Sequence, residues 1–246
     1  GKIPFIHFFD GFRTSHEYQK VACWDYADLA DMLDWDALND FRRKSLNPEH
    51  PAQRGTAQNP DVFFQAKEAS NKAYDAIPEV VEEYMEKVSA MTGRDYKLFN
   101  YYGDPQADRV IIAMGSVCDA AKETIDYMMA KGEKVGLVQI HLYRPFKEDA
   151  FLAAIPETAT KIAVLDRDKE NGAIGEPVYL DVLAAYYRAG KQATIVGGRY
   201  GLGSKDVTPS QIISVFENLK LDAPKNNFTI GIVDDVTHLS LPVLPQ

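Results

Sequence analysis

The sequence predicts an α/β protein: a three-layer sandwich with a mostly parallel sheet, preceded by a helical connector. The first observation is that short, continuously apolar segments alternate with amphipathic helical patterns through the second half of the chain. The second is that the apolar run 110–114 ends at Gly115-Ser116, where a helix with its own capping signal begins. A second buried strand follows that helix and completes a strand–helix–strand unit, which is the usual way to join parallel strands.

The elements of the second half follow in regular order. Strands are expected at 110–114, 135–140, 161–165 and 193–196, with a further strand at 228–233. Helices are expected at 117–130, 148–154, 177–188 and 209–219. Two helix starts have the spacing of a capping box, Ser116 with Asp119 and Thr208 with Gln211.

The first half is expected to be less regular. The apolar run 3–9 is typical of a buried strand, and a short helix is expected to follow it as far as Cys23. Residues 59–93 predict about thirty residues of amphipathic helix, bent or restarted at Pro78 and stopped at Thr92-Gly93. This segment is expected to be a long connector rather than a compact core.

Composition excludes several function classes. The chain has 246 residues and a formal charge of −9, spread along its length, which makes nucleic acid an unlikely partner. No apolar run reaches the roughly 18 residues that a membrane span needs, so we expect a cytoplasmic protein without a membrane partner. The two cysteines are far apart, and neither they nor the histidines have metal-ligand spacing, so no metal site is predicted. The aspartates between Asp25 and Asp40 predict an acidic surface helix or turn, because their order breaks the pattern of a calcium loop.

One glycine-rich stretch, 196–205, lies between an expected strand and a capped helix, where phosphate-binding loops occur. Its spacing fits neither common phosphate-binding motif, because Gly203-Ser204-Lys205 inverts the Walker order. A structural turn is therefore favoured, with Arg199 and Lys205 as candidate anion contacts. Ser116, at the start of the 117–130 helix, is a third candidate, although a simple helix cap explains it as well.

Two other polar features have simple structural explanations. The charged loop 166–172 follows the third strand without an evident nucleophile or base, so a solvated loop is favoured. His141 follows the second strand as an isolated histidine, which is more typical of a structural residue than of an acid or base.

Several long strings together resemble one family, pyruvate:ferredoxin (flavodoxin) oxidoreductase. They cover essentially the whole chain in order: PFIHFFDGFRTSHE, RGTAQNPDVFFQA, PEVVEEYMEKVSAMTGR, IIAMGSVCDAAKETIDYM, KVGLVQIHLYRPF, IAVLDRDKENGAIGEPVYLDV, IVGGRYGLGSKDV and FTIGIVDDVTHLSLP. The resemblance implies that 1–96 hold the tail of the first domain of that enzyme with the connector, and that 97–246 form its second domain. That second domain resembles the C-terminal domain of transketolase.

The resemblance also implies an activity for the longer parent enzyme. Pyruvate and coenzyme A would give acetyl-CoA and CO2, with thiamine diphosphate, Mg2+ and [4Fe-4S] clusters as cofactors and ferredoxin or flavodoxin as acceptor. The remaining domains would be partners of this chain, and the parent is expected to be a homodimer. No Gly-Asp-Gly motif for thiamine diphosphate occurs here, and two cysteines fall far short of the about twelve thiolates of three clusters. We therefore assign no catalytic residue and no cofactor to this chain.

Three hypotheses follow. The first is a non-catalytic structural and interface fragment of the oxidoreductase. The alternative is a self-contained α/β module that binds an anionic ligand such as coenzyme A at Ser116, Arg199 or Lys205. An independent hydrolase has the weakest support, because the chain has no G-x-S-x-G elbow.

Overall fold

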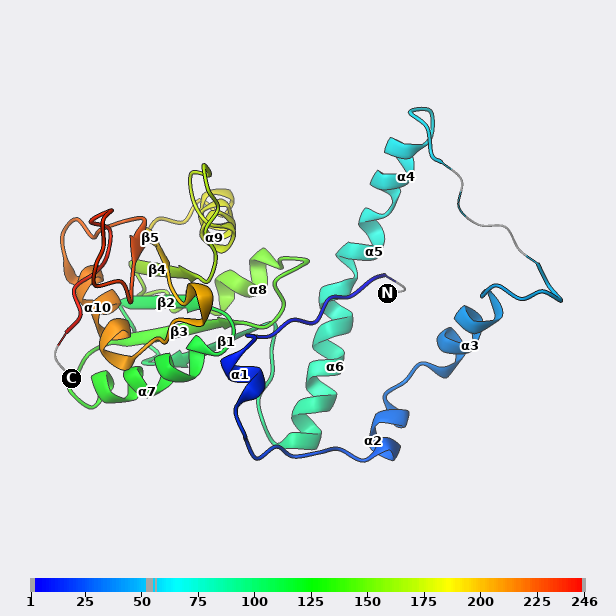
Figure 1. The fold of residues 1–246 in the computed structure, drawn as a ribbon, viewed down its shortest axis with the longest axis horizontal. Helices are drawn as coiled ribbons and strands as arrows, with labels where there is room; N and C mark the ends of the chain where they lie inside the picture. Colours follow the sequence, from blue (N-terminus) through cyan, green and yellow to red (C-terminus); the bar gives the residue numbers. More distant parts are fainter. Residues whose placement is uncertain (1–2, 52–54, 56, 245–246) are drawn as a thin grey trace. The chain divides into compact units, whose positions relative to one another are not determined.

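The computed structural model describes residues 3–51, 55 and 57–244 (Figure 1). The chain divides into two compact units. The first comprises Gly1–Ile3 and Tyr18–Val80, and the second comprises Pro4–Glu17 and Val81–Gln246. The domain boundary that the resemblance implies at residue 96 stays a prediction.

The second unit is built on a six-stranded sheet with the order β1-β3-β2-β4-β5-β6. The strands are β1 (Phe99–Gly103), β2 (Arg109–Ala113), β3 (Val135–Ile140), β4 (Lys161–Asp166), β5 (Thr194–Arg199) and β6 (Phe228–Thr229). All neighbouring pairs are parallel except β1 with β3, which is antiparallel. The predicted α/β class with a mostly parallel sheet is confirmed.

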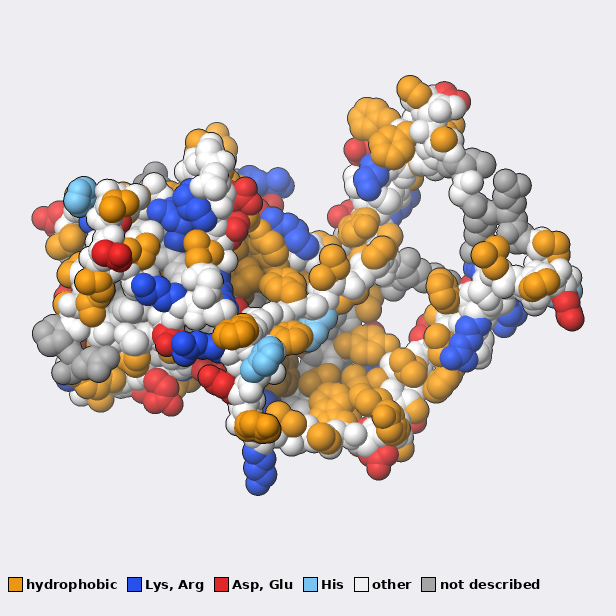
Figure 2. All heavy atoms as spheres, viewed as in Figure 1, with side chains coloured by type: hydrophobic (Ala, Val, Ile, Leu, Met, Phe, Trp, Pro, Cys, Tyr) orange, Lys and Arg blue, Asp and Glu red, His pale blue; other side chains and the backbone are white. Residues whose placement is uncertain are grey.

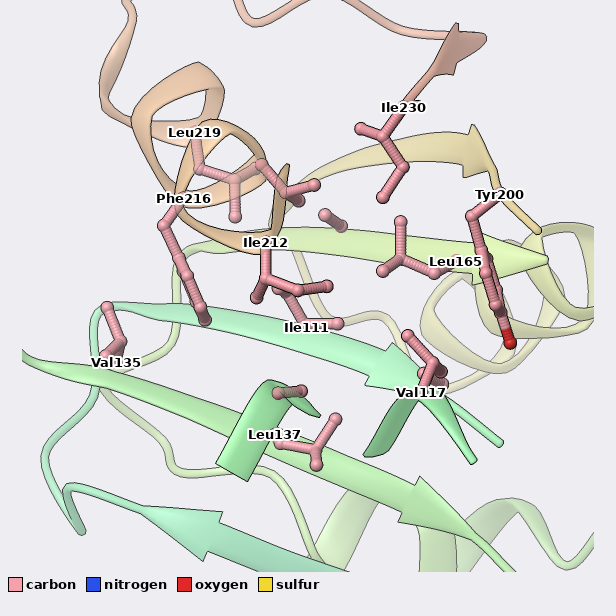
Figure 3. Packing of buried hydrophobic residues seen from close by; sticks show 14 of the residues in the cluster. Ile111, Val117, Val135, Leu137, Leu165, Tyr200, Ile212, Phe216, Leu219 and Ile230 are labelled. Carbon is pink, nitrogen blue, oxygen red and sulfur yellow. The ribbon is translucent and has the colours of Figure 1, made fainter. Parts of the chain in front are cut away.

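Helices cover both faces of this sheet (Figure 1). The helices are α7 (Val117–Met129), α8 (Glu148–Ala153), α9 (Pro177–Arg188) and α10 (Pro209–Lys220). Successive residues of a strand point to opposite faces, so Ile111 packs with α7 and α10 whereas Val110 and Ile112 pack with α8 and α9. Figure 3 shows Ile212 and Phe216 of α10 directed at the sheet. Two apolar layers therefore enclose the sheet, and the expected three-layer sandwich is confirmed.

The predicted strands and helices between residues 97 and 246 match the structure closely, with three differences. The sequence did not predict β1, an edge strand whose aromatic and polar residues are mostly half-buried. β5 runs three residues further than predicted, through Gly197 and Gly198. Glycine is needed there because a Cβ at Gly197 would lie 2.9 Å from the Tyr179 ring, and one at Gly198 would overlap the Phe228 ring. β6 covers two residues of the predicted 228–233.

The first unit contains short helices. They are α2 (Tyr26–Asp31), α3 (Trp35–Arg43), α4 (Phe63–Ala69) and α5 (Asn71–Asp75), and the first turn of α6 (Ile77–Thr92) also belongs to it. The predicted restart near Pro78 is confirmed, whereas the break between α4 and α5 was not predicted. Pro78 lacks the N–H that would continue the hydrogen bonding of α5, which explains the break before α6. The predicted stop after Thr92 is confirmed, with Gly93 at φ +70°.

Two expectations for the N-terminal segment are wrong. The helix expected to reach Cys23 is a single turn, α1 (Arg13–His16). Residues 4–9 form no strand, because no strand among the described residues pairs with them. The acidic run behaves as expected: Asp25 and Asp34 accept hydrogen bonds from the backbone N–H groups of Ala27 and Ala37 at the starts of α2 and α3.

Candidate functional site at the carboxyl edge of the sheet

The candidate site lies where β2, β4 and β5 end. Because these strands are parallel, the turns that follow them meet at one edge of the sheet. The turns are Gly115-Ser116 after β2, Arg167 after β4 and Tyr200-Gly201 after β5. Parallel sheets often bind ligands at this edge, so the partners of its polar groups decide whether a ligand has room to bind.

A carboxylate from the N-terminal segment occupies this edge. Asp10 Oδ2 accepts a hydrogen bond from the backbone N–H of Ser116 at 2.5 Å, and Asp10 Oδ1 accepts one from Arg167 Nη1 at 2.6 Å. Burial opposes ionisation of Asp10, yet the hydrogen bonds from Ser116 and Arg167 outweigh it and hold its pKa below the usual value. Asp10 is therefore an anion seated at the start of α7, where the helix dipole favours negative charge.

Arg167 joins this contact to the end of β5. Its Nε donates a hydrogen bond to the carbonyl oxygen of Gly201 at 2.9 Å. Gly201 has φ +67°, a left-handed conformation that favours glycine. The Tyr200 hydroxyl beside it donates to the carbonyl oxygen of Met114 at 3.2 Å. The three strand ends are thus tied to one another by hydrogen bonds.

The predicted capping role of the Ser116 side chain is wrong. Within the described part of the chain, the Ser116 side chain makes no capping hydrogen bond to α7. The Ser116 backbone is already helical, with φ −66° and ψ −23°, whereas a capping serine needs an extended backbone. Asp10 accepts the hydrogen bond of the Ser116 N–H instead. The predicted capping box at Thr208 and Gln211 is confirmed at α10.

Asp166, at the end of β4, caps α9. It is 4% exposed, and its carboxylate oxygens accept the backbone N–H groups of Val178 at 3.0 Å and Tyr179 at 3.1 Å. Burial raises the pKa of Asp166 to about 6, against the opposing effect of these two hydrogen bonds. The expectation that the whole loop 166–172 is solvated is therefore wrong at its first residue.

Arg199 lies buried beside Glu176. Arg199 Nη1 is 3.4 Å from Glu176 Oε2, and Arg199 Nη2 donates to the carbonyl oxygen of Asn227 at 3.1 Å. Lys169 Nζ approaches Glu176 from the exposed side at 3.7 Å. An external anion would have to displace Glu176 to reach the Arg199 guanidinium. The geometry therefore favours an internal ion pair, and an anion contact at Arg199 stays a prediction.

Lys205 follows a tight turn. The 3₁₀ turn Leu202–Ser204 contains left-handed residues at Gly203 and Ser204, and Lys205 itself is exposed. This is the structural turn that the glycine spacing favours. Ser116, Arg199 and Lys205 are thus in three different settings, and the first two already have internal partners. The anion contact at Lys205 is likewise a prediction without a test.

His141 also has a structural setting. Its backbone N–H donates to the carbonyl oxygen of Leu98 at 3.0 Å, and its ring meets the Tyr96 ring edge-on. Partial desolvation of the ring, with a contribution from Lys122, lowers the pKa of His141, although the residue as a whole is exposed. This agrees with the interpretation of His141 as a structural residue.

Sequence patterns missed the residues that organise this edge. Asp10 falls in residues 1–96, which the resemblance assigns to the tail of another domain, and the sequence patterns did not single out Glu176. A signal was available for Glu176: it directly precedes Pro177, which marks the first turn of α9, so a buried position near a strand end was foreseeable.

The thiols do not form a metal centre. Cys118 lies in the first turn of α7 and is buried, and burial raises the pKa of its thiol to about 12, whereas Cys23 is exposed in the other unit. Among residues 3–51, 55 and 57–244, no three histidines, cysteines or carboxylates are grouped to hold a metal ion. Over the same residues, no helix is long and apolar enough to cross a bilayer.

Two family models match the chain. A model described as pyruvate flavodoxin/ferredoxin oxidoreductase, thiamine diphosphate-binding, matches residues 1–86. A model described as pyruvate:ferredoxin oxidoreductase core domain II matches residues 107–212. The two matches leave only a short stretch between them and the last part of the chain outside the models.

Curated relatives are similar over nearly the whole chain. Pyruvate-flavodoxin oxidoreductase from Enterobacter agglomerans is 60% identical over 99% of this chain, and pyruvate:ferredoxin oxidoreductase from Moorella thermoacetica is 54% identical over 98%. The chain spans 21% of the length of each of these relatives. Among solved structures, a 2-oxoglutarate:ferredoxin oxidoreductase from Magnetococcus marinus is 18% identical, with a TM-score of 0.42 over 71% of this chain and 28% of that one.

Proposed function

Because this chain belongs to the pyruvate:ferredoxin (flavodoxin) oxidoreductase family, we propose that it serves such an enzyme as a structural and interface segment. The parent enzyme would convert pyruvate and coenzyme A to acetyl-CoA and CO2 and pass the electrons to ferredoxin or flavodoxin. The chain spans about a fifth of the relatives named above, so the catalytic groups are assigned to the remaining domains of the parent.

The observation that carries this proposal is the pairing at the carboxyl edge of the sheet. Asp10 with Arg167, and Glu176 with Arg199, are ion pairs between residues of this chain. Asp166 likewise directs its oxygens at the start of α9. Polar groups that satisfy one another stabilise a fold, whereas a catalytic centre directs such groups at a substrate.

The iron–sulfur clusters of the parent do not fit the residues of this chain. A [4Fe-4S] cluster is held by four thiolates, whereas the chain has two cysteines, one of them buried and one exposed. We therefore assign the clusters to other domains of the parent. Residues 1–86 match the family model described as thiamine diphosphate-binding, and we assign thiamine diphosphate and Mg2+ to other domains only because the Gly-Asp-Gly motif is missing from this sequence. We place the parent in the cytoplasm, because free cysteines suit a reducing compartment. The homodimer is proposed from the family resemblance alone.

The proposal can be tested by asking whether this segment restores pyruvate oxidation to a parent enzyme from which the segment has been removed. The parent polypeptide without the segment should lose pyruvate oxidation, and adding the separately produced segment should restore part of it. A segment carrying both Arg167→Ala and Arg199→Ala should restore less, since both ion pairs are broken. If the parent keeps full activity without the segment, the proposed structural role is wrong.

Calorimetry separates this proposal from the binding-module hypothesis. We expect no heat when coenzyme A is titrated into the isolated chain. Saturable heat that disappears in Lys205→Ala would instead favour an anion-binding module.

A further inference from the structure

The segment Pro4–Glu17 belongs to the same compact unit as the sheet, although it is remote from the sheet in sequence. Two charged side chains of this segment bind it to the rest of the unit. Asp10 binds Arg167 and the N–H of Ser116, and Arg13 Nη1 lies 2.9 Å from Asp206 Oδ1 in the loop after β5. The first contact is partly sheltered and the second is exposed.

The apolar side chains of this segment contribute little to its attachment. Their exposed fractions run from 61% at Phe8 to 83% at Ile6. Figure 2 shows hydrophobic side chains exposed along this part of the chain. Neither cluster of buried hydrophobic residues includes a member of Pro4–Glu17 in the part of the chain that the structure describes. The hydrophobic effect, which holds the rest of this unit together, is therefore nearly absent from this contact.

The backbone between the two anchors is also unusual. Phe12 has φ +55° and ψ −91°, a positive-φ conformation that residues with a bulky side chain rarely adopt. Such a conformation persists only where the surroundings hold it. Asp10 and Arg13 flank Phe12 and supply that restraint.

We propose that Pro4–Glu17 is a strap held by charge over the carboxyl edge of the sheet, which detaches as a unit while the sheet stays folded. Detachment frees the Ser116 N–H and the Arg167 guanidinium and uncovers the edge between α7 and Gly201. Ion pairs weaken with ionic strength, whereas the apolar layers on the two sheet faces do not. The strap therefore opens first when salt rises.

Amide hydrogen exchange at Ser116, followed by NMR on the full chain, reports strap opening directly. The Ser116 N–H is protected by Asp10, and Asp10→Ala should speed its exchange about tenfold, in line with a lost hydrogen bond to a charged group. Amides of β2 and β4 should exchange as in the unaltered chain. Asp119→Ala is the matched control, because it removes an acidic residue from the first turn of α7 rather than from the strap; it should change the rate at Ser116 less than about twofold.

Salt and acetate complete the test. Raising NaCl from about 0.05 to 1 M should speed Ser116 exchange in the unaltered chain but not in Asp10→Ala. Sodium acetate should slow Ser116 exchange in Asp10→Ala relative to NaCl at the same ionic strength, because acetate supplies a carboxylate that can accept the Ser116 N–H in place of Asp10. The proposal is overturned if Asp10→Ala leaves the Ser116 rate unchanged, or if the β2 and β4 amides accelerate equally, which would mean that strap and sheet open together.

Discussion

Arg199 and Glu176 face each other in the interior, with Arg199 Nη1 3.4 Å from Glu176 Oε2 and the two side chains only 6% and 5% exposed. Arg199 ends β5, and Glu176 immediately precedes α9, so the pair joins the sheet to a helix of one covering layer. A buried charge without its partner is far less stable than the pair.

Breaking this pair on one side should destabilise the fold strongly. Glu176→Gln or Arg199→Met should lower the free energy of unfolding by about 3–5 kcal/mol. The first leaves the Arg199 guanidinium buried without a carboxylate, and the second leaves Glu176 with only the more distant Lys169 as a cation. The double substitution should be less destabilising than the sum of the two single ones. Urea unfolding followed by circular dichroism measures each value.

An exposed ion pair on the same unit supplies the control for this prediction. Arg188 pairs with Glu148, and its side chain is 71% exposed. Arg188→Gln should change stability by less than about 1 kcal/mol. Equal effects at Arg188 and Arg199 would contradict a special role for the buried pair.

Asp166 should titrate far from the usual range of an aspartate. Because burial raises its pKa to about 6, the folded chain binds more protons at this site than the unfolded chain between about pH 4 and 6. The contribution of Asp166 to the free energy of unfolding therefore falls as the pH rises through that window. Carboxyl 13C shifts should give a midpoint near pH 6, and Asp166→Asn should remove that signal. A midpoint near pH 4 would mean that the hydrogen bonds from α9 outweigh burial.

The glycine at position 198 should be required by its neighbours. Gly198→Ala should lower the free energy of unfolding by about 1–3 kcal/mol, because the added methyl group meets the Phe228 ring. Gly11→Ala is the control, since nothing lies within 4 Å of its added methyl group. Combining Gly198→Ala with Phe228→Leu should recover part of the loss; no recovery would place the cause elsewhere.

The regular part of the fold was predictable because buried strands and helices have recognisable patterns of apolar residues in the sequence. Strands β2, β3 and β4 each contain an apolar run, and α9 begins at a proline, so their boundaries were found within a residue. β1 was not predicted because apolar and polar residues alternate only weakly along this edge strand, which pairs antiparallel with β3.

The candidate site was less predictable because its contacts are long-range. Asp10 and Ser116 are 106 positions apart, and nothing about an aspartate or a serine at these positions indicates that the two residues are in contact. A serine before a helix suggests a cap by its own side chain, and only the folded chain shows a remote carboxylate in that place. The glycines at the end of β5 resembled a phosphate-binding loop, whereas they make room for the Tyr179 and Phe228 rings.

The central claim is that this segment supports an oxidoreductase without performing its chemistry. The most direct measurement is 14CO2 release from carboxyl-labelled pyruvate by the isolated chain, supplied with thiamine diphosphate, Mg2+, coenzyme A and a viologen acceptor. The structural role predicts release no faster than in the protein-free control, from a chain that circular dichroism shows to be folded. Release that rises with the concentration of the chain and saturates with pyruvate would contradict it.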